Sequence, residues 1–224
     1  MRSTQGDAGP PAVRGVRGEG VRYLALGDSY TIGEGVAASE RWPEQLAALL
    51  RAKGVSVDPP EIVARTGWTT GELMDGIDRE APGGPFDLVS LLIGVNDQYR
   101  GVDPAEYRVA FRALLDRAVG FAAGEATQVI VLSIPDWGVT PFAQGRDRAR
   151  IASEIDRFNE INRRETAALG ARYVDVTQAS RAAPPAGAGT RLAPDGLHPS
   201  GEMYAIWARL VLPQARLVLG GGAG

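Results

Sequence analysis

The histidine at position 198 follows Asp195 by three residues in the segment APDGLHPSGE, and it is the only histidine of the chain. At this spacing in a turn, the Asp195 carboxylate can meet Nδ1 of the imidazole, which leaves Nε2 free as a base and stabilises the imidazolium. The alternative is a surface histidine beside an aspartate that caps a helix. Any mechanism that needs an imidazole base must use His198, and a zinc site of several histidines is excluded.

A serine that can act as a nucleophile occurs near the start of the chain, in GDSYTIGEG at residues 27–35. We expect Ser29 to lie at a strand-to-helix turn, where its hydroxyl stands clear of the sheet edge. Unpaired backbone N–H groups at such a turn favour negative charge. From the three residues GDS alone, a serine that merely caps the turn is the better explanation, because so short a match is common by chance.

Two further segments hold candidate hydrogen-bond donors for an oxyanion. Gly67, in ARTGWTTGEL at residues 64–73, can present its backbone N–H without a side chain in the way. Asn96, in LLIGVNDQYRG at residues 91–101, carries an amide that donates hydrogen bonds without needing a particular protonation state. The alternatives are an ordinary turn glycine and an asparagine that caps its own backbone.

Short apolar segments alternate with amphipathic ones, which predicts a parallel sheet with right-handed helical crossovers. Asp103 and Pro104 are typical of a helix start and Gly170 of a helix end, and Ser39 is a candidate N-cap. Strands are expected at residues 21–26, 61–65, 87–93, 128–134 and 172–176, and helices at residues 39–53, 70–79, 104–122, 146–169 and 199–217. The expected fold is a three-layer α/β/α sandwich with about five parallel strands.

This topology predicts where the candidate residues meet. The segments with Ser29, Gly67 and Asn96 follow the first three expected strands, and the segment with Asp195 and His198 follows the fifth. Loops at the carboxyl ends of parallel strands share one face of an open sheet, and ligands bind at that face. Residues far apart in the sequence should therefore converge there.

Length and composition exclude several classes of protein. The chain has 224 residues, a net charge of −3 and no cysteine, so disulfides, thiolate metal sites and a cysteine nucleophile are excluded. The mildly acidic balance indicates no nucleic-acid partner. No apolar segment reaches the roughly 20 residues of a spanning helix and no signal peptide is visible, so we expect a cytoplasmic protein.

The domain organisation follows from the same composition. One domain with a buried core is expected at residues 21–218. A flexible tail rich in glycine, proline and arginine should precede it at residues 1–20, and a glycine-rich tail should follow at residues 219–224. The low-complexity segment AAPPAGAGT, residues 182–190, is expected to be a loop near the active face.

Taken together, the four segments resemble the four sequence blocks of the SGNH hydrolase family, the GDSL-type serine esterases and lipases. Each block is weak alone, but four blocks in the family's order, spanning residues 23–207, are specific. The resemblance implies the flavodoxin-like α/β fold of that family and no metal or organic cofactor. The blocks read Gly27-Asp28-Ser29, Gly67, Gly94-Val95-Asn96-Asp97 and Asp195-Gly196-Leu197-His198-Pro199.

The resemblance also implies a role for each matching residue. Ser29 would be the nucleophile, His198 its base, and Asp195 the residue that orients the imidazole. The backbone N–H groups of Ser29 and Gly67, together with the side-chain amide of Asn96, would form the oxyanion hole.

One residue departs from the family pattern. The family often has leucine after the serine, where this chain has Tyr30. Tyr30 either packs beneath its loop or lines the pocket, so the departure affects the expected acyl preference and leaves the chemistry intact. By the resemblance, Asp28 and Asp97 look structural and hold their turns.

The substrate pocket is less constrained by the sequence. Trp137 and Phe142 lie in the loop after the fourth expected strand, where they are candidates for an acyl pocket, with plain core packing as the alternative. Gln98, Tyr99 and Arg100 follow Asn96 and are candidates for contacts with the alcohol portion. A small pocket would favour acetyl esters, and an open groove would favour longer chains.

The expected function is hydrolysis of a small acyl ester or lipid-like substrate through an acyl-enzyme intermediate. Two alternatives keep the fold: an acyltransferase, and a non-catalytic module that binds a carbohydrate or a protein partner. A flavodoxin-like nucleotide or phospho-acceptor domain fits less well, because the loop after the first strand lacks a phosphate-cradling glycine pattern. The sequence leaves the oligomeric state open.

Overall fold

One fully parallel sheet forms the centre of the molecule. The computed structural model describes residues 20–182 and 191–220. Its strands lie in the order β2-β1-β3-β4-β5, and every neighbouring pair is parallel. The strands are β1 (Tyr23–Gly27), β2 (Glu61–Ala64), β3 (Leu88–Leu92), β4 (Val129–Leu132) and β5 (Arg172–Val174).

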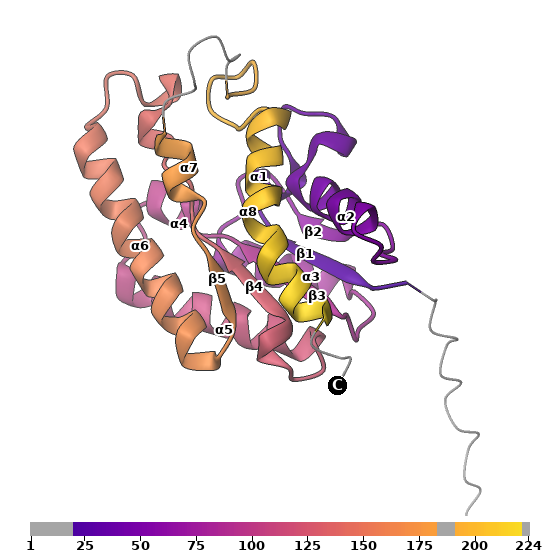
Figure 1. The fold of residues 1–224 in the computed structure, drawn as a ribbon. Helices are drawn as coiled ribbons and strands as arrows, with labels where there is room; N and C mark the ends of the chain where they lie inside the picture. Colours follow the sequence, from indigo (N-terminus) through magenta and orange to yellow (C-terminus); the bar gives the residue numbers. More distant parts are fainter. Residues whose placement is uncertain (1–19, 183–190, 221–224) are drawn as a thin grey trace, which may run out of the picture.

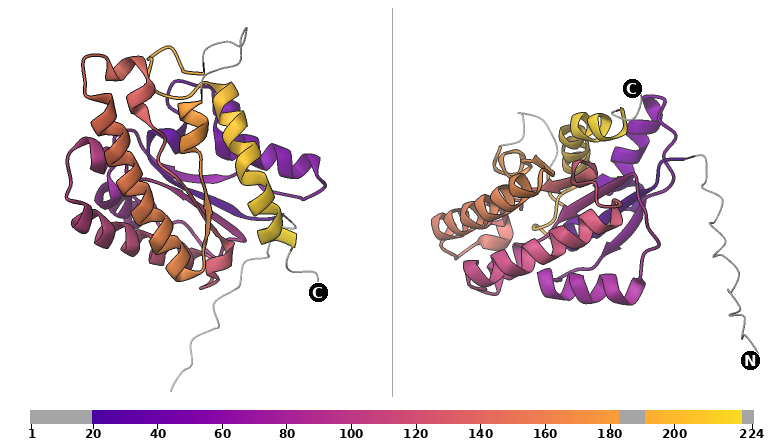
Figure 2. Two further views of the ribbon diagram at one scale, coloured as in Figure 1. Left: turned by 60° about the vertical axis from the view of Figure 1, so that its left-hand side comes forward. Right: turned by 90° about the horizontal axis from the view of Figure 1, so that it is seen from below.

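Helices cover both faces of this sheet. Helices α2 and α8 pack side by side on one face, and α3 and α5 lie on the opposite face, with α6 alongside α5 (Figures 1 and 2). The predicted three-layer α/β/α sandwich is therefore confirmed. The helices are α1 (Ser29–Ile32), α2 (Trp42–Ala52), α3 (Thr70–Glu80), α4 (Val95–Tyr99), α5 (Pro104–Phe121), α6 (Arg148–Leu169), α7 (Thr177–Arg181) and α8 (Gly201–Gly220). Four short 3-10 turns complete them: η1 (Ala38–Glu40), η2 (Ala126–Gln128), η3 (Trp137–Val139) and η4 (Pro141–Ala143).

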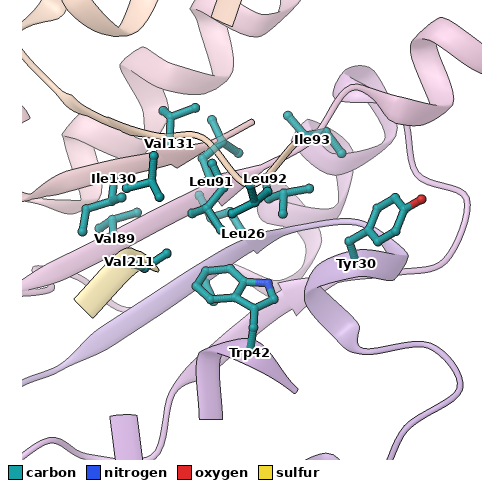
Figure 3. Packing of buried hydrophobic residues seen from close by; sticks show 14 of the residues in the cluster. Leu26, Tyr30, Trp42, Val89, Leu91, Leu92, Ile93, Ile130, Val131 and Val211 are labelled. Carbon is teal, nitrogen blue, oxygen red and sulfur yellow. The ribbon is translucent and has the colours of Figure 1, made fainter. Parts of the chain in front are cut away.

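The three central strands are buried along their whole length, whereas the edge strands β2 and β5 are partly exposed. Strands covered on both faces need apolar side chains at every position, which explains their nearly uninterrupted apolar sequences. Figure 3 shows side chains of β1, β3 and β4 packed with Trp42 of α2 and Val211 of α8. This core fixes the positions of the strand ends, where the candidate residues lie.

The expected helix at residues 39–53 begins later than predicted. Ser39 lies inside the 3-10 turn η1, and the N-cap of α2 is Arg41, so the predicted N-cap is wrong. Pro43 gives the physical reason, because proline lacks an N–H and fits only in the first turn of a helix. The predicted start of α5, with Asp103 as N-cap, and the predicted end of α6 at Gly170 are both confirmed.

The two ends of the described chain bear on the expected tails. Helix α8 continues to Gly220, so residues 219 and 220 belong to its last turn and not to a C-terminal tail. Residues 1–19, 183–190 and 221–224 lie outside the described residues, and with them most of the expected N-terminal tail and of the low-complexity loop. No helix within residues 20–182 and 191–220 is long and apolar enough to cross a membrane. The cytoplasmic location stays a prediction.

A contact between α3 and the loop before it depends on a glycine. The ring of Trp68 lies so close to Gly76 that a Cβ added there would overlap it. We expect Gly76→Ala to lower the free energy of unfolding by roughly 1–3 kcal/mol, the usual effect of overpacking. Urea unfolding of both proteins measures the difference.

The same helix offers a matched control. Gly71 has open space around its Cα, so Gly71→Ala should leave stability unchanged or raise it by up to about 1 kcal/mol through helix propensity. Equal effects of the two substitutions would contradict the role of the Trp68 contact.

Candidate active site

Ser29 lies at the first position of α1, directly after the end of β1. The Asp28 side chain caps this short helix, because its Oδ1 accepts a hydrogen bond from the Tyr30 N–H at 3.0 Å. A glycine precedes Asp28 because a Cβ at Gly27 would lie 2.5 Å from the Leu92 carbonyl oxygen on β3. The strand end, the glycine and the aspartate cap together place the Ser29 hydroxyl at the carboxyl edge of the sheet.

Asp195 and His198 form the hydrogen-bonded pair that their spacing predicts. Nδ1 of His198 lies 2.6 Å from Oδ2 of Asp195. The other carboxylate oxygen accepts hydrogen bonds from the backbone N–H groups of Leu197 at 2.9 Å and His198 at 3.0 Å. Partial burial raises the pKa of Asp195, but the hydrogen bonds from the imidazole and the two N–H groups outweigh it, so the pKa lies below its usual value. The carboxylate is therefore ionised at neutral pH and can hold the imidazole in one orientation.

Loops that follow all five strands meet around one cavity of about 180 Å³. Ser29 and His198 both line it, although they lie 169 positions apart in the sequence. Both residues are more than nine-tenths buried. The lining residues are Ser29, Tyr30, Thr66, Gly67, Val95, Asn96, Tyr99, Trp137, Phe142, Leu197 and His198.

Asn96 lines the cavity with its side chain held by a backbone carbonyl. Its Nδ2 donates a hydrogen bond to the Trp68 carbonyl oxygen at 2.9 Å. An amide nitrogen carries two hydrogens, so the second N–H is left for a group inside the cavity. The residue next to it, Asp97, faces away and accepts hydrogen bonds from the Oγ1 of Thr70 at 2.7 Å and from its N–H at 3.0 Å. Asp97 thereby joins α4 to the start of α3, in line with its expected structural position.

Gly67 lies in the left-handed region, with φ of 84°, in the loop after β2. Its carbonyl oxygen accepts a hydrogen bond from Nη2 of Arg100 at 2.7 Å, and Arg100 also forms an ion pair with Glu72 at 3.2 Å. Arg100 does not line the cavity. It instead fastens the Gly67 loop to α3, a role for which the sequence carried no signal.

Asp28 is fully buried beside Ser29, and burial raises its pKa to about 8. The hydrogen bond from the Tyr30 N–H lowers the pKa, but by less than burial raises it. Among the described residues, its Oδ2 has no hydrogen-bond partner. At neutral pH the carboxyl group is therefore mostly protonated, so it places no full negative charge next to Ser29.

Tyr30 does both things that the sequence left open. It lines the cavity, and its ring packs edge-on against the His198 imidazole at a centroid distance of 5.5 Å. Trp207 of α8 lies behind it at 6.0 Å. Figure 3 shows Tyr30 at the end of the apolar core. The residue that departs from the family pattern therefore supports the histidine by packing.

The predicted pocket residues Trp137 and Phe142 both line the cavity. Their rings lie 5.9 Å apart, and Tyr99 completes the group at 5.4 Å from Trp137. Arg146, which the sequence analysis did not single out, stacks on all three rings. No pattern could have found it, because it acts through a contact with residues distant in sequence.

No cluster of three or more His, Cys, Asp or Glu side chains in residues 20–182 and 191–220 is arranged to hold a metal ion. The fold places a largely apolar cavity, with Ser29 and the Asp195–His198 pair on its wall, at the carboxyl ends of the strands. A model of the GDSL-like lipase/acylhydrolase family matches residues 25–206, which is most of the chain. The chain therefore belongs to the GDSL-like lipase/acylhydrolase family, and by this membership it is a hydrolase of ester bonds.

Solved structures share the fold at low sequence identity. TesA is 19% identical, with 88% of this chain and 99% of that chain covered and a TM-score of 0.66. A lipase/acylhydrolase from Enterococcus faecalis is 21% identical, with 89% and 96% covered and a TM-score of 0.64. Axe2, an acetylxylan esterase from Geobacillus stearothermophilus, is 21% identical, with 88% and 95% covered and a TM-score of 0.64. No curated protein sequence matches the chain.

The raised pKa of Asp28 predicts a pH-dependent stability. In the folded state Asp28 keeps its proton up to about pH 8, whereas in the unfolded chain it loses the proton near pH 4. Because the folded state binds the extra proton, this group makes folding less favourable as the pH rises from about 4 to about 8. Asn keeps the capping oxygen and does not titrate. The stability of Asp28→Asn relative to wild type should therefore increase over this range.

Urea unfolding at pH 5 and at pH 8 measures this change. A difference between the two proteins that stays constant with pH would show that Asp28 titrates as an ordinary aspartate.

Proposed function

We propose that the protein is a serine esterase that hydrolyses carboxylic esters through an acyl-enzyme intermediate. The observation that supports this proposal best is the 2.6 Å contact between Asp195 and His198 at a cavity that Ser29 also lines. A carboxylate on Nδ1 leaves Nε2 of the imidazole to accept a proton. Nothing else in the described chain supplies an imidazole, since the sequence has one histidine.

In the proposed reaction, the Ser29 hydroxyl attacks the ester carbonyl while His198 removes its proton. The negative charge on the carbonyl oxygen is stabilised by the backbone N–H groups of Ser29 and Gly67 and by Asn96. His198 then gives its proton to the departing alcohol oxygen, and Asp195 stabilises the imidazolium in between. A water molecule, deprotonated by the same histidine, attacks the acyl-enzyme and releases the acid and free Ser29.

Preorganisation of the oxyanion hole supports this assignment. The hydrogen bond from Asn96 to the Trp68 carbonyl and the hydrogen bond from Arg100 to the Gly67 carbonyl hold two of the three donors before substrate binds. Donors that are already oriented stabilise a developing charge without the cost of reorganisation during the reaction. The neutral carboxyl of Asp28 adds no opposing charge.

The size of the cavity supports a short acyl group. Its volume of about 180 Å³ is below the roughly 300–1,000 Å³ of sites that enclose drug-sized ligands. The walls are largely aromatic or aliphatic, from Tyr30, Val95, Tyr99, Trp137 and Phe142. We therefore favour acetyl and similarly short esters over long-chain lipids. Axe2 is named as an acetylxylan esterase, a substrate class that fits a cavity of this size.

Replacement of the proposed nucleophile gives the first test. We expect wild type to hydrolyse p-nitrophenyl acetate and Ser29→Ala to lose activity by a factor of roughly 10⁴ or more. Ser56→Ala, which alters an exposed serine outside the cavity, should keep full activity. Assays of p-nitrophenyl esters from acetate to decanoate measure both points and the acyl preference. A folded wild type without activity on any of these esters would contradict the proposal and favour an acyltransferase or a binding module.

Replacement of Asn96 tests the oxyanion hole. We expect Asn96→Ala to fold and to lose roughly 100- to 1000-fold in kcat, because one donor to the oxyanion is removed. The KM should change far less, since the donor acts mainly in the transition state. Steady-state kinetics on p-nitrophenyl acetate measure the separate effects on kcat and KM, and thermal unfolding checks that the variant folds. A turnover near that of wild type would remove Asn96 from the mechanism.

A further inference from the structure

A second, larger groove adjoins the catalytic cavity. It has a volume of about 520 Å³ and lies between the start of α5 and the first half of α6. Tyr99 and Trp137 line both spaces, so their rings form the wall between them. The groove has the size of sites that enclose drug-sized ligands, whereas the catalytic cavity is smaller than those sites. A substrate that crosses this wall would have one small and one large portion.

The guanidinium of Arg146 packs against the aromatic rings of this wall. Its guanidinium carbon lies 5.2 Å from the ring centre of Tyr99, 5.3 Å from Trp137 and 5.4 Å from Phe142. Its Nη2 also donates a hydrogen bond to the Tyr99 hydroxyl at 3.1 Å. Tyr99 and Phe142 are nearly half exposed, at 46% and 42%, so the part of each ring that Arg146 does not cover is available to a ligand.

A chain of hydrogen bonds runs beneath the groove and fixes its polar groups. The indole N–H of Trp137 donates to Oε1 of Gln98 at 2.8 Å, and Nε2 of Gln98 donates to Oε2 of Glu154 at 2.8 Å. The Nε of Arg150 donates to the other oxygen of Glu154 at 2.7 Å. Gln98 is buried in this arrangement, with an exposed fraction of 5%. The groove is therefore built before a ligand binds.

The charges in the groove are balanced. Three arginines line it, Arg146, Arg150 and Arg157, together with three carboxylates, Asp103, Asp147 and Glu154. Equal numbers of both signs give no net attraction for an anion or a cation. A long apolar acyl chain is also disfavoured, because it would remove water from these charged groups without replacing their hydrogen bonds.

We infer that the groove between α5 and α6 binds the alcohol portion of the ester, and that this portion is uncharged and rich in hydroxyl groups. Guanidinium and carboxylate groups offer fixed donors and acceptors to hydroxyls, and the exposed aromatic faces offer apolar contact to the ring carbons of a sugar-like alcohol. The short acyl group then occupies the catalytic cavity on the other side of Tyr99. The inference rests on the proposed esterase function and adds the class of alcohol to it.

Arg157 is the residue with which to test the groove. Among the residues that the structure describes, it has no ion pair, so its guanidinium is available to a ligand. It lies on α6 at the groove and outside the catalytic cavity. Arg164 lies on the same helix, outside the groove, where it forms an exposed ion pair with Glu160. Arg164→Ala therefore serves as the matched control.

The experiment compares hydrolysis of sucrose monoacetate with that of ethyl acetate, two acetates that differ only in the alcohol. We expect wild type to prefer sucrose monoacetate in kcat/KM, and Arg157→Ala to lose roughly tenfold more on sucrose monoacetate than on ethyl acetate. A loss of this size corresponds to one hydrogen bond to a charged group. Arg164→Ala should match wild type on both substrates.

A second variant tests the wall. Tyr99→Ala removes an aromatic ring that lines the proposed alcohol site, and we expect the ratio of kcat/KM on sucrose monoacetate to that on ethyl acetate to fall severalfold. Tyr99→Phe keeps the ring and should keep the wild-type ratio.

The outcomes separate the two proposals. Equal losses on both acetates in Arg157→Ala, or a wild-type preference for ethyl acetate, would overturn the groove as an alcohol site while leaving the esterase proposal in place. A wild type that hydrolyses none of these esters would overturn the esterase proposal itself.

Discussion

The arrangement of the candidate site depends on the parallel pairing of β1 with β3. Their register sets Gly27 opposite Leu92, so that the two strands end together at one edge of the sheet. Strand β1 leads into α1 and strand β3 leads into α4, which brings Ser29 and Asn96 to the same cavity. The approach at this point is so close that a side chain at Gly27 would contact the Leu92 carbonyl. The loops after β2, β4 and β5 supply the other walls of the cavity around these two strand ends.

Burial around this pairing controls the electrostatics of the site. Asp28 follows the end of β1 and Asp97 lies in the short helix after β3, and burial raises the pKa of both. Asp195, in a more exposed turn, has its pKa lowered by hydrogen bonds to His198 and the backbone. Burial therefore disfavours the charged forms of Asp28 and Asp97, whereas hydrogen bonds favour the charged form of Asp195 beside His198.

The loop after β4 has a different role, since it shapes the space in which a substrate would lie. Trp137 is held by Gln98, which lies two residues after Asn96 in the same short helix. The wall of the cavity and the proposed oxyanion donor are thus parts of one hydrogen-bonded unit. Substitutions in this wall would alter substrate preference together with the support of the oxyanion hole.

The sequence by itself determined the order of strands and helices and the four segments with chemistry. These features are local: apolar periodicity, helix caps such as Asp103, and the three-residue spacing of Asp195 and His198 act over a few neighbouring residues. Only the tertiary structure decided that Arg100 fastens the Gly67 loop, that Arg146 stacks on three aromatic rings, and that burial raises the pKa of Asp28. Long side chains can reach many neighbours and a pKa depends on burial, so each of these properties follows from which distant segments pack together.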